Sequence, residues 1–194
     1  KRLLAYSSIA HAGYLMIGIT TAFANGPGSG AIYYGSEGVF FYLVAYALMT
    51  LGTFGAIIGL KTEGRPVKTV DDLKGLAYKQ PMAALALVIC LLSLSGIPPL
   101  IGFWGKFQIF VAAFAATPEG GYGPLFSLAV IGVLNAAVGA YYYLRIVVAI
   151  TLGSSTRPVE TTGSWPVALA AGTCATLTLG LALYTAPIAR ACRD

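Results

Sequence analysis

The chain has few charged residues and very few side chains of the kinds that bind metals or carry redox chemistry. Only 10% of its 194 residues are charged, whereas soluble domains have about 25%. It contains one histidine and three cysteines. Cys90, Cys174 and Cys192 have neither the spacing of a metal site nor that of a disulfide framework. This composition argues against an iron–sulfur or haem centre in the chain.

Several binding motifs are also missing from the sequence. It has no phosphate-binding loop, no dinucleotide fingerprint and no paired carboxylates within an apolar segment. The net charge is +5, but the basic residues cluster in loops and near the ends, as membrane topology requires, which does not indicate nucleic-acid binding. We therefore expect no metal, nucleotide, flavin or nucleic acid to bind this chain.

Long apolar segments dominate what is present. The chain is 57% hydrophobic and its mean hydropathy is +0.78, which predicts an all-α integral membrane protein. Since a crossing helix needs about 20 apolar residues, the clearest candidates are 3–24, 38–60, 125–152 and 165–187. We treat 1–194 as a single membrane domain. Because the chain begins at Lys1 without a methionine, we expect it to be the C-terminal part of a longer protein.

The segment 81–116 is too long for one straight crossing. As a continuous helix it would extend more than about 50 Å, whereas the hydrocarbon core is about 30 Å thick. It is interrupted by Gly96, Ile97, Pro98 and Pro99, so it either crosses twice or forms one broken crossing. One crossing places Lys1, the basic loop 61–80, Arg145 and Arg157 on the cytoplasmic side, as the positive-inside rule prefers. Arg190 and Arg193 favour two crossings. We predict one broken crossing, five crossings in all, and an external C-terminus.

Lys106 is the strongest candidate functional residue. It is the one charged residue between Gly96 and Ala116, and a charged group in such a segment costs a few kcal/mol. Burial disfavours the charged form of an amine, so a buried lysine can exchange protons near neutral pH. The alternative is a lysine whose side chain extends to the membrane surface. Transporters place ionisable groups beside broken helices, which favours a role in proton or ion movement.

A polar stripe on the first predicted helix provides further candidates. Helical spacing places Ser7, Ser8, His11, Tyr14 and Gly18 on one face. His11 is a candidate proton relay because histidine titrates near neutral pH; the alternative is a hydrogen-bonded contact between helices. Ser7 and Tyr14 then belong to a candidate hydrated path. Asn135, on a later helix, is a candidate for the same path or, alternatively, a bridge between helices.

Five segments together resemble one family, the antiporter-like membrane subunits of respiratory complex I, and most closely its subunit N (subunit 2 in organelles). They are KRLLAYSSIAHAGYLMIG (1–18), YLVAYALMTLGTFGAI (42–57), DDLKGLAYKQP (71–81), LSLSGIPPLIGFWGKF (92–107) and YYYLRIV (141–147). The resemblance implies the last five crossings of a fourteen-helix fold that has inverted repeats. It also implies that Lys106 is a proton-channel residue beside a broken helix made by Gly96, Pro98 and Pro99.

The resemblance also implies where the rest of the machinery lies. A central lysine, a second lysine and its paired glutamate would precede Lys1. NADH, FMN, iron–sulfur clusters and quinone would bind partner subunits, and the neighbours of this chain would be other membrane subunits of the complex and lipid. The Ala/Gly-rich spans favour a bacterial inner membrane over that of an organelle.

Three alternative functions remain open from the sequence. The chain could belong to a multisubunit sodium/proton antiporter, which shares KRLLAYSS and the Gly-Ile-Pro-Pro break. It could belong to a hydrogenase-type or ferredoxin-linked membrane complex. It could also be a membrane scaffold in which Lys106 is inert. The tyrosine run before Arg145 and the segment 42–57 favour the complex I subunit.

Overall fold

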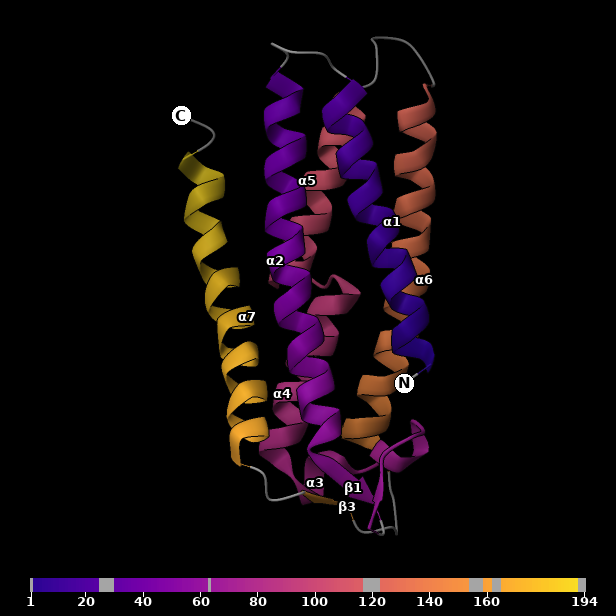
Figure 1. The fold of residues 1–194 in the computed structure, drawn as a ribbon, viewed down its shortest axis with the longest axis vertical. Helices are drawn as coiled ribbons and strands as arrows, with labels where there is room; N and C mark the ends of the chain where they lie inside the picture. The colour runs from indigo at the N-terminus through magenta and orange to yellow at the C-terminus, as the bar shows by residue number, and fades with distance from the viewer. Residues whose placement is uncertain are drawn as a thin grey trace.

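The computed structural model describes residues 2–24, 30–62, 64–116, 123–153, 159–161 and 165–191. Long helices lie side by side along one axis and form an elongated bundle (Figure 1). The four long helices are α1 (Arg2–Ala24), α2 (Gly30–Ile58), α6 (Pro124–Leu152) and α7 (Trp165–Ala191). Each contains a stretch long and apolar enough to cross a membrane. The predicted all-α membrane fold is confirmed.

The crossing between α2 and α6 is broken, as the sequence predicts. The helices α4 (Pro81–Ser95) and α5 (Ile101–Ala115) follow one another along the length of the bundle (Figure 1). Gly96 ends α4 with φ 84°, a left-handed conformation that glycine adopts without strain. Pro98 and Pro99 lie in the turn, where proline cannot continue the hydrogen-bond ladder of a helix. The segment 81–116 thus crosses once, which gives five crossings.

The helix boundaries differ from prediction mainly at α2. The glycine-rich sequence predicted a flexible break at 25–30 and a helix from Gly38, but α2 already begins at Gly30. Most of the predicted break, 25–29, lies outside the described residues. At the other end of the chain, α7 continues past the expected Pro187 to Ala191.

A small sheet joins two connections at the end of the bundle where α2 ends, and the sequence did not predict it. The strands β1 (Leu60–Thr62), β2 (Arg65–Pro66) and β3 (Val159–Thr161) pair antiparallel in the order β2-β1-β3. A 3-10 turn, η1 (Asp71–Leu73), and the short helix α3 (Leu76–Lys79) follow. Lys74 hydrogen-bonds to exposed Asp71 and holds the pKa of that carboxyl below its usual value.

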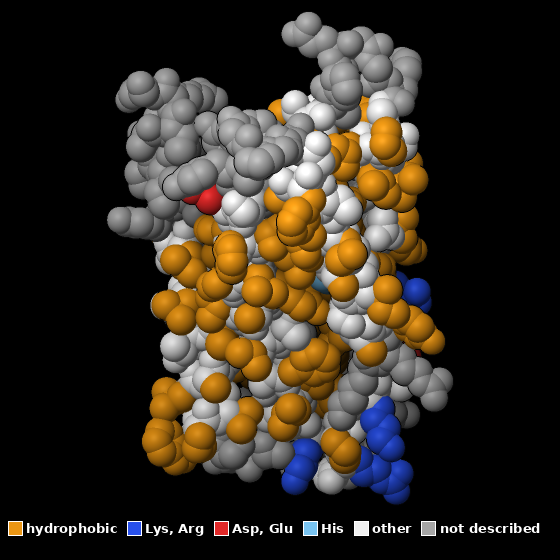
Figure 2. Space-filling view, turned by 45° about the horizontal axis from the view of Figure 1, so that its top comes forward, with side chains coloured by type: hydrophobic (Ala, Val, Ile, Leu, Met, Phe, Trp, Pro, Cys, Tyr) orange, Lys and Arg blue, Asp and Glu red, His pale blue; other side chains and the backbone are white. Residues whose placement is uncertain are grey.

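Small residues on α2 let its neighbours approach closely. Gly52 faces Cys90 of α4 and Cys174 of α7, and Gly55 faces Ala171 of α7. Gly52 and Gly55 therefore lie on a close-packing face of α2. On the outside, hydrophobic side chains cover the flank of the bundle and basic side chains gather toward one end (Figure 2). Such a surface suits a lipid bilayer bounded by a charged interface.

Candidate functional site

The break between α4 and α5 provides the hydrogen-bond partners of Lys106. Lys106 lies on α5, and only 7% of it is exposed. Its Nζ donates to the carbonyl oxygen of Leu94 at 2.8 Å and more weakly to that of Ser95 at 3.4 Å. The last carbonyls of a helix have no partner within the helix and carry its partial negative charge. The end of α4 therefore solvates the amine without a carboxylate.

Two glycines make this approach possible. A Cβ atom at Gly96 would lie 3.2 Å from Nζ of Lys106, and one at Gly102 would overlap the carbonyl oxygen of Ser93. The backbone N–H of Gly102 also donates to Oγ of Ser93 at 3.1 Å. The start of α5 is thereby held against the end of α4, and Lys106 lies one turn further along α5.

Tyr14 covers the other side of the amine. Nζ of Lys106 lies 5.4 Å from the centre of the Tyr14 ring, within the range of a cation–π interaction. The Tyr14 ring also packs edge-on against Phe110 of α5. The ring thus links the lysine on α5 to α1.

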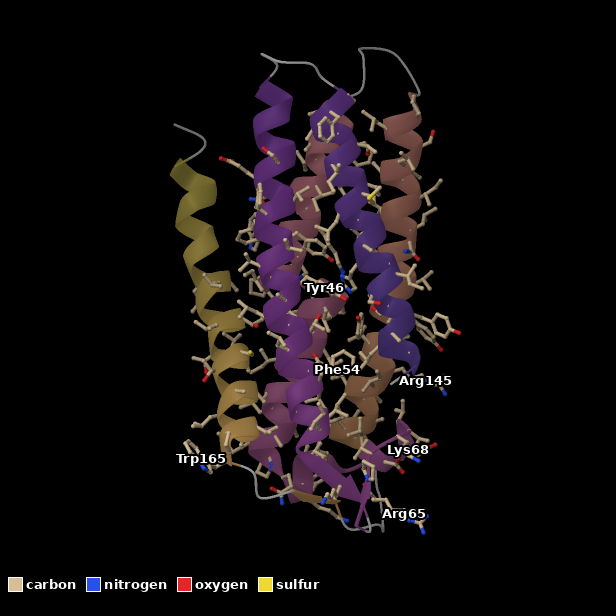
Figure 3. The ribbon with its side chains drawn as sticks, viewed as in Figure 1. Tyr46, Phe54, Arg65, Lys68, Arg145 and Trp165 are labelled. Carbon is tan, nitrogen blue, oxygen red and sulfur yellow. The ribbon has the colours of Figure 1, made fainter. Side chains whose placement is uncertain are left out.

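His11 is buried and held by tyrosine hydroxyls from two other helices. Its Nδ1 lies 2.5 Å from the hydroxyl of Tyr42 on α2, and its Nε2 lies 3.3 Å from that of Tyr143 on α6. The imidazole also stacks on Tyr46, with the ring centres 4.7 Å apart. Figure 3 shows Tyr46 in the middle of the bundle, with Arg65 and Lys68 toward the end that carries the strands. The centre of the imidazole also lies 5.7 Å from the centre of the Tyr14 ring, which faces Nζ of Lys106.

Hydroxyl groups continue this network away from Lys106. The hydroxyl of Tyr143 also hydrogen-bonds to Oγ of Ser7, and Tyr142 donates to the same Ser7 oxygen at 3.0 Å. Each hydroxyl can donate one proton and accept another. His11, Tyr143, Ser7 and Tyr142 therefore form a continuous hydrogen-bonded row between α1 and α6.

The fold brings most of the candidate site residues predicted from the sequence close together. Ser7, His11, Tyr14 and Lys106 lie in the interior of the bundle, and Gly96, Pro98 and Pro99 form the break beside them. Asn135 lies on the exposed side of α6. The placement of Ser8 on the polar face was wrong. It is exposed and donates to the Ala5 carbonyl, because one residue advances a helix by about 100°.

Sequence reasoning missed the tyrosines that surround His11. The run Tyr141 to Tyr143 read as an aromatic belt at the membrane surface, but 71% of Tyr141 and only 2% of Tyr143 are exposed. Tyr42 is fully buried. The one available signal was spacing, since Tyr42 and Tyr46 lie one turn apart on α2. A cavity of about 480 Å³ next to Lys106, between α5 and α6, was also not predictable.

Comparison with known proteins identifies the family. The family described as NADH:quinone oxidoreductase/Mrp antiporter, TM, matches residues 1–151. The chain belongs to this family. It is 48% identical over 148 residues to NADH-quinone oxidoreductase subunit N of Bdellovibrio bacteriovorus, which covers 76% of this chain and 28% of that protein. The chain spans about a third of the length of the curated relatives it matches.

Solved structures give the same result. A chain of respiratory complex I from Thermus thermophilus, solved with bound aureothin, matches with a TM-score of 0.72 and 34% identity. That match covers 96% of this chain and 38% of the other. A chain of the Mrp complex from Dietzia matches with a TM-score of 0.62 at 21% identity, over 97% and 45% of the two chains, and shows the shared fold. The apolar helices and bacterial relatives make this chain a multi-pass protein of the bacterial inner membrane.

Proposed function

We propose that this chain is the C-terminal, proton-translocating part of a subunit N-type membrane subunit of an NADH:quinone oxidoreductase. Its similarity to subunit N supports this assignment. In this proposal residues 1–194 form one membrane domain, with other membrane subunits of the complex and lipid as neighbours. NADH, FMN, the iron–sulfur clusters and quinone bind partner subunits.

The observation that carries the proposal is the environment of Lys106. Lys106 is only 7% exposed, and its amine donates hydrogen bonds to carbonyl groups at the end of a broken helix. These carbonyls accept hydrogen bonds from both the charged and the neutral amine, so neither state is left without partners. Burial without a carboxylate keeps the two protonation states close in free energy, because no counter-charge fixes the ammonium form. Lys106 is thus suited to take up and release a proton.

The row of hydroxyls defines the proposed route between Lys106 and the end of the bundle that carries the strands. The Tyr14 ring lies beside both Lys106 and His11, and each nitrogen of His11 faces a tyrosine hydroxyl. A proton added to one imidazole nitrogen can leave from the other. A charge on Lys106 disfavours a proton on His11, since like charges at low dielectric repel by up to several kcal/mol. Lys106 and His11 therefore take up a proton alternately. A positive charge that arrives in a neighbouring part of the protein then drives the release of that proton.

The test is the Lys106→Ala variant of the full-length subunit, assembled in its complex in sealed membrane vesicles. NADH–quinone turnover and proton uptake are recorded together. We expect the complex to assemble and proton uptake, with coupled turnover, to fall severely. Lys106→Arg keeps the charge but holds its proton permanently, so it is expected to fail as well. Lys68→Ala removes an exposed lysine and serves as the matched control. Normal proton uptake and turnover by both Lys106 variants would contradict the proposal and favour a scaffold role.

An Mrp-type antiporter subunit is the second candidate, because the matching family covers both kinds of protein. The likeness to the Mrp structure, at 21% identity, concerns the fold alone. The two functions differ in what drives the protons. Proton uptake that requires NADH and quinone supports the oxidoreductase, whereas uptake driven by a sodium gradient without NADH supports the antiporter.

A further inference from the structure

Two cysteines that are far apart in sequence meet where three helices pack. Cys90 lies on α4 and Cys174 on α7, and both contact the same point on α2. A Cβ atom at Gly52 would lie 2.6 Å from Sγ of Cys90 and 3.0 Å from Cβ of Cys174. Sγ of Cys90 and Cβ of Cys174 are therefore no further apart than the sum of these two distances. Because Gly52 has no side chain, the Cys90 thiol and the Cys174 side chain can both occupy the space beside it.

The helices pack closely around this point. Cys90 packs in one cluster with Ala86 of α4 and Ala175 of α7, and such small residues allow helix backbones to come together. A disulfide requires Cβ atoms about 3.5–4.5 Å apart. The Cβ atoms of Cys90 and Cys174 lie 3.9 and 3.0 Å from the Cβ position at Gly52, so closing the bond takes at most a small shift of α7 against α4 and a rotation that brings the two sulfurs together. Both thiols are free in this structure.

The pair can also be reached from the lipid. A cavity of about 380 Å³ opens between α2, α4 and α7 and is lined by Ala86 and Ala171, one turn before Cys90 and Cys174 respectively. Its other walls include Gly55, Gly172 and Trp165. Cys90 is buried, whereas Cys174 is partly exposed. A small lipid-soluble reagent thus has a path to within one helical turn of both thiols.

We propose that Cys90 and Cys174 form a dithiol site that a lipid-soluble two-electron oxidant closes to a disulfide, which ties α7 to the first half of the broken helix. With a diazene oxidant, the thiolate of one cysteine adds to the N=N bond. The second thiolate then attacks that sulfur and displaces the nitrogen. One S–S bond forms, both thiol protons pass to the two nitrogens, and the diazene becomes a hydrazine.

The experiment uses the full-length subunit in its complex, with a protease recognition sequence inserted after Gly153, between α6 and α7. Membranes are treated with the diazene oxidant diamide, cleaved, and run on a denaturing gel without reductant. We expect the two fragments to stay joined and to separate once dithiothreitol is added. Separate fragments without reductant in the parent protein would overturn the proposal.

Single substitutions identify the pair. Cys90→Ala and Cys174→Ala are each expected to abolish the link, and assembly of the complex is checked for both. Cys192→Ser removes the third cysteine, which lies outside the described residues, and is expected to leave the link intact. A link that persists in Cys90→Ala, or that disappears in Cys192→Ser, would assign the bond to a different pair and refute the proposal.

Discussion

The environment of single side chains decides which polar residues can act together. Tyr143 is the residue that connects the two parts of the network, since its hydroxyl contacts both His11 and Ser7. Its neighbours in sequence face elsewhere: Tyr141 lies on the exposed surface of α6, and Tyr142 is half-buried against Ser7. The three tyrosines look equivalent in the sequence, and only packing distinguishes them.

Removing the hydroxyl of Tyr143 is therefore expected to interrupt the row. In Tyr143→Phe, Nε2 of His11 loses a partner, while Ser7 keeps Tyr142. A buried polar group left without a partner costs about 1–3 kcal/mol, so we expect an assembled but less stable complex with proton uptake reduced several-fold. The number of protons taken up per NADH oxidised, recorded in sealed vesicles, measures the effect. Tyr141→Phe, the exposed control, should behave as the parent does; equal behaviour of the two variants would remove Tyr143 from the route.

At this scale the sequence predicted the residues that stand out against an apolar background. Lys106 and His11 were identifiable because each is an isolated titratable group in a long apolar segment. Tyr42 and Tyr46 were not, because tyrosine is also common at membrane interfaces. The partners of Lys106 were not predictable either, since backbone carbonyls leave no mark on the sequence beyond the break that frees them.

Among the helices and strands, the broken crossing depends most on glycine, because only a residue without a side chain lets α5 start so close to the end of α4. Gly102→Ala places a methyl group against the Ser93 carbonyl and must push α5 away from the end of α4. We expect a loss of about 1–3 kcal/mol, as for other overpacked interiors, and weaker proton uptake because Lys106 moves with α5. Gly13→Ala, at a helical glycine with nothing within 4 Å, is the control and should be neutral. Thermal stability of the assembled complex compares the two.

Element boundaries were predictable where length or backbone chemistry sets them. Apolar length located α1, α6 and α7, and Gly96 with Pro98 and Pro99 located the break. The strands were missed because β1 and β3 have three residues each and lie nearly a hundred positions apart. Strands this short pair only because the helices bring them together. They are also too short to show the alternation of apolar and polar residues by which a strand is recognised in a sequence.

For the whole molecule, the arrangement fixes which connections share a side of the membrane. The end of α5 and the start of α6 lie at the opposite end of the bundle from the strands and the loop that carries Lys68 (Figure 1). We expect Lys68→Cys to react with an impermeant maleimide from the cytoplasmic side and Gly123→Cys from the external side, in a background without the native cysteines. Labelling of right-side-out and inverted vesicles measures this. Reaction of both positions from the same side would require two crossings in 81–116 and would contradict the fold.

The uncharged surroundings of Lys106 make its protonation sensitive to the membrane potential. Its contacts in the described chain are carbonyl oxygens and an aromatic ring, none of which carries a net charge. Each protonation of the amine therefore adds a full elementary charge part-way across the bilayer. A charge that crosses a whole 100 mV potential changes in energy by about 2.3 kcal/mol, and this site experiences a fraction of that. We therefore expect the proton occupancy of Lys106 to depend on the membrane potential.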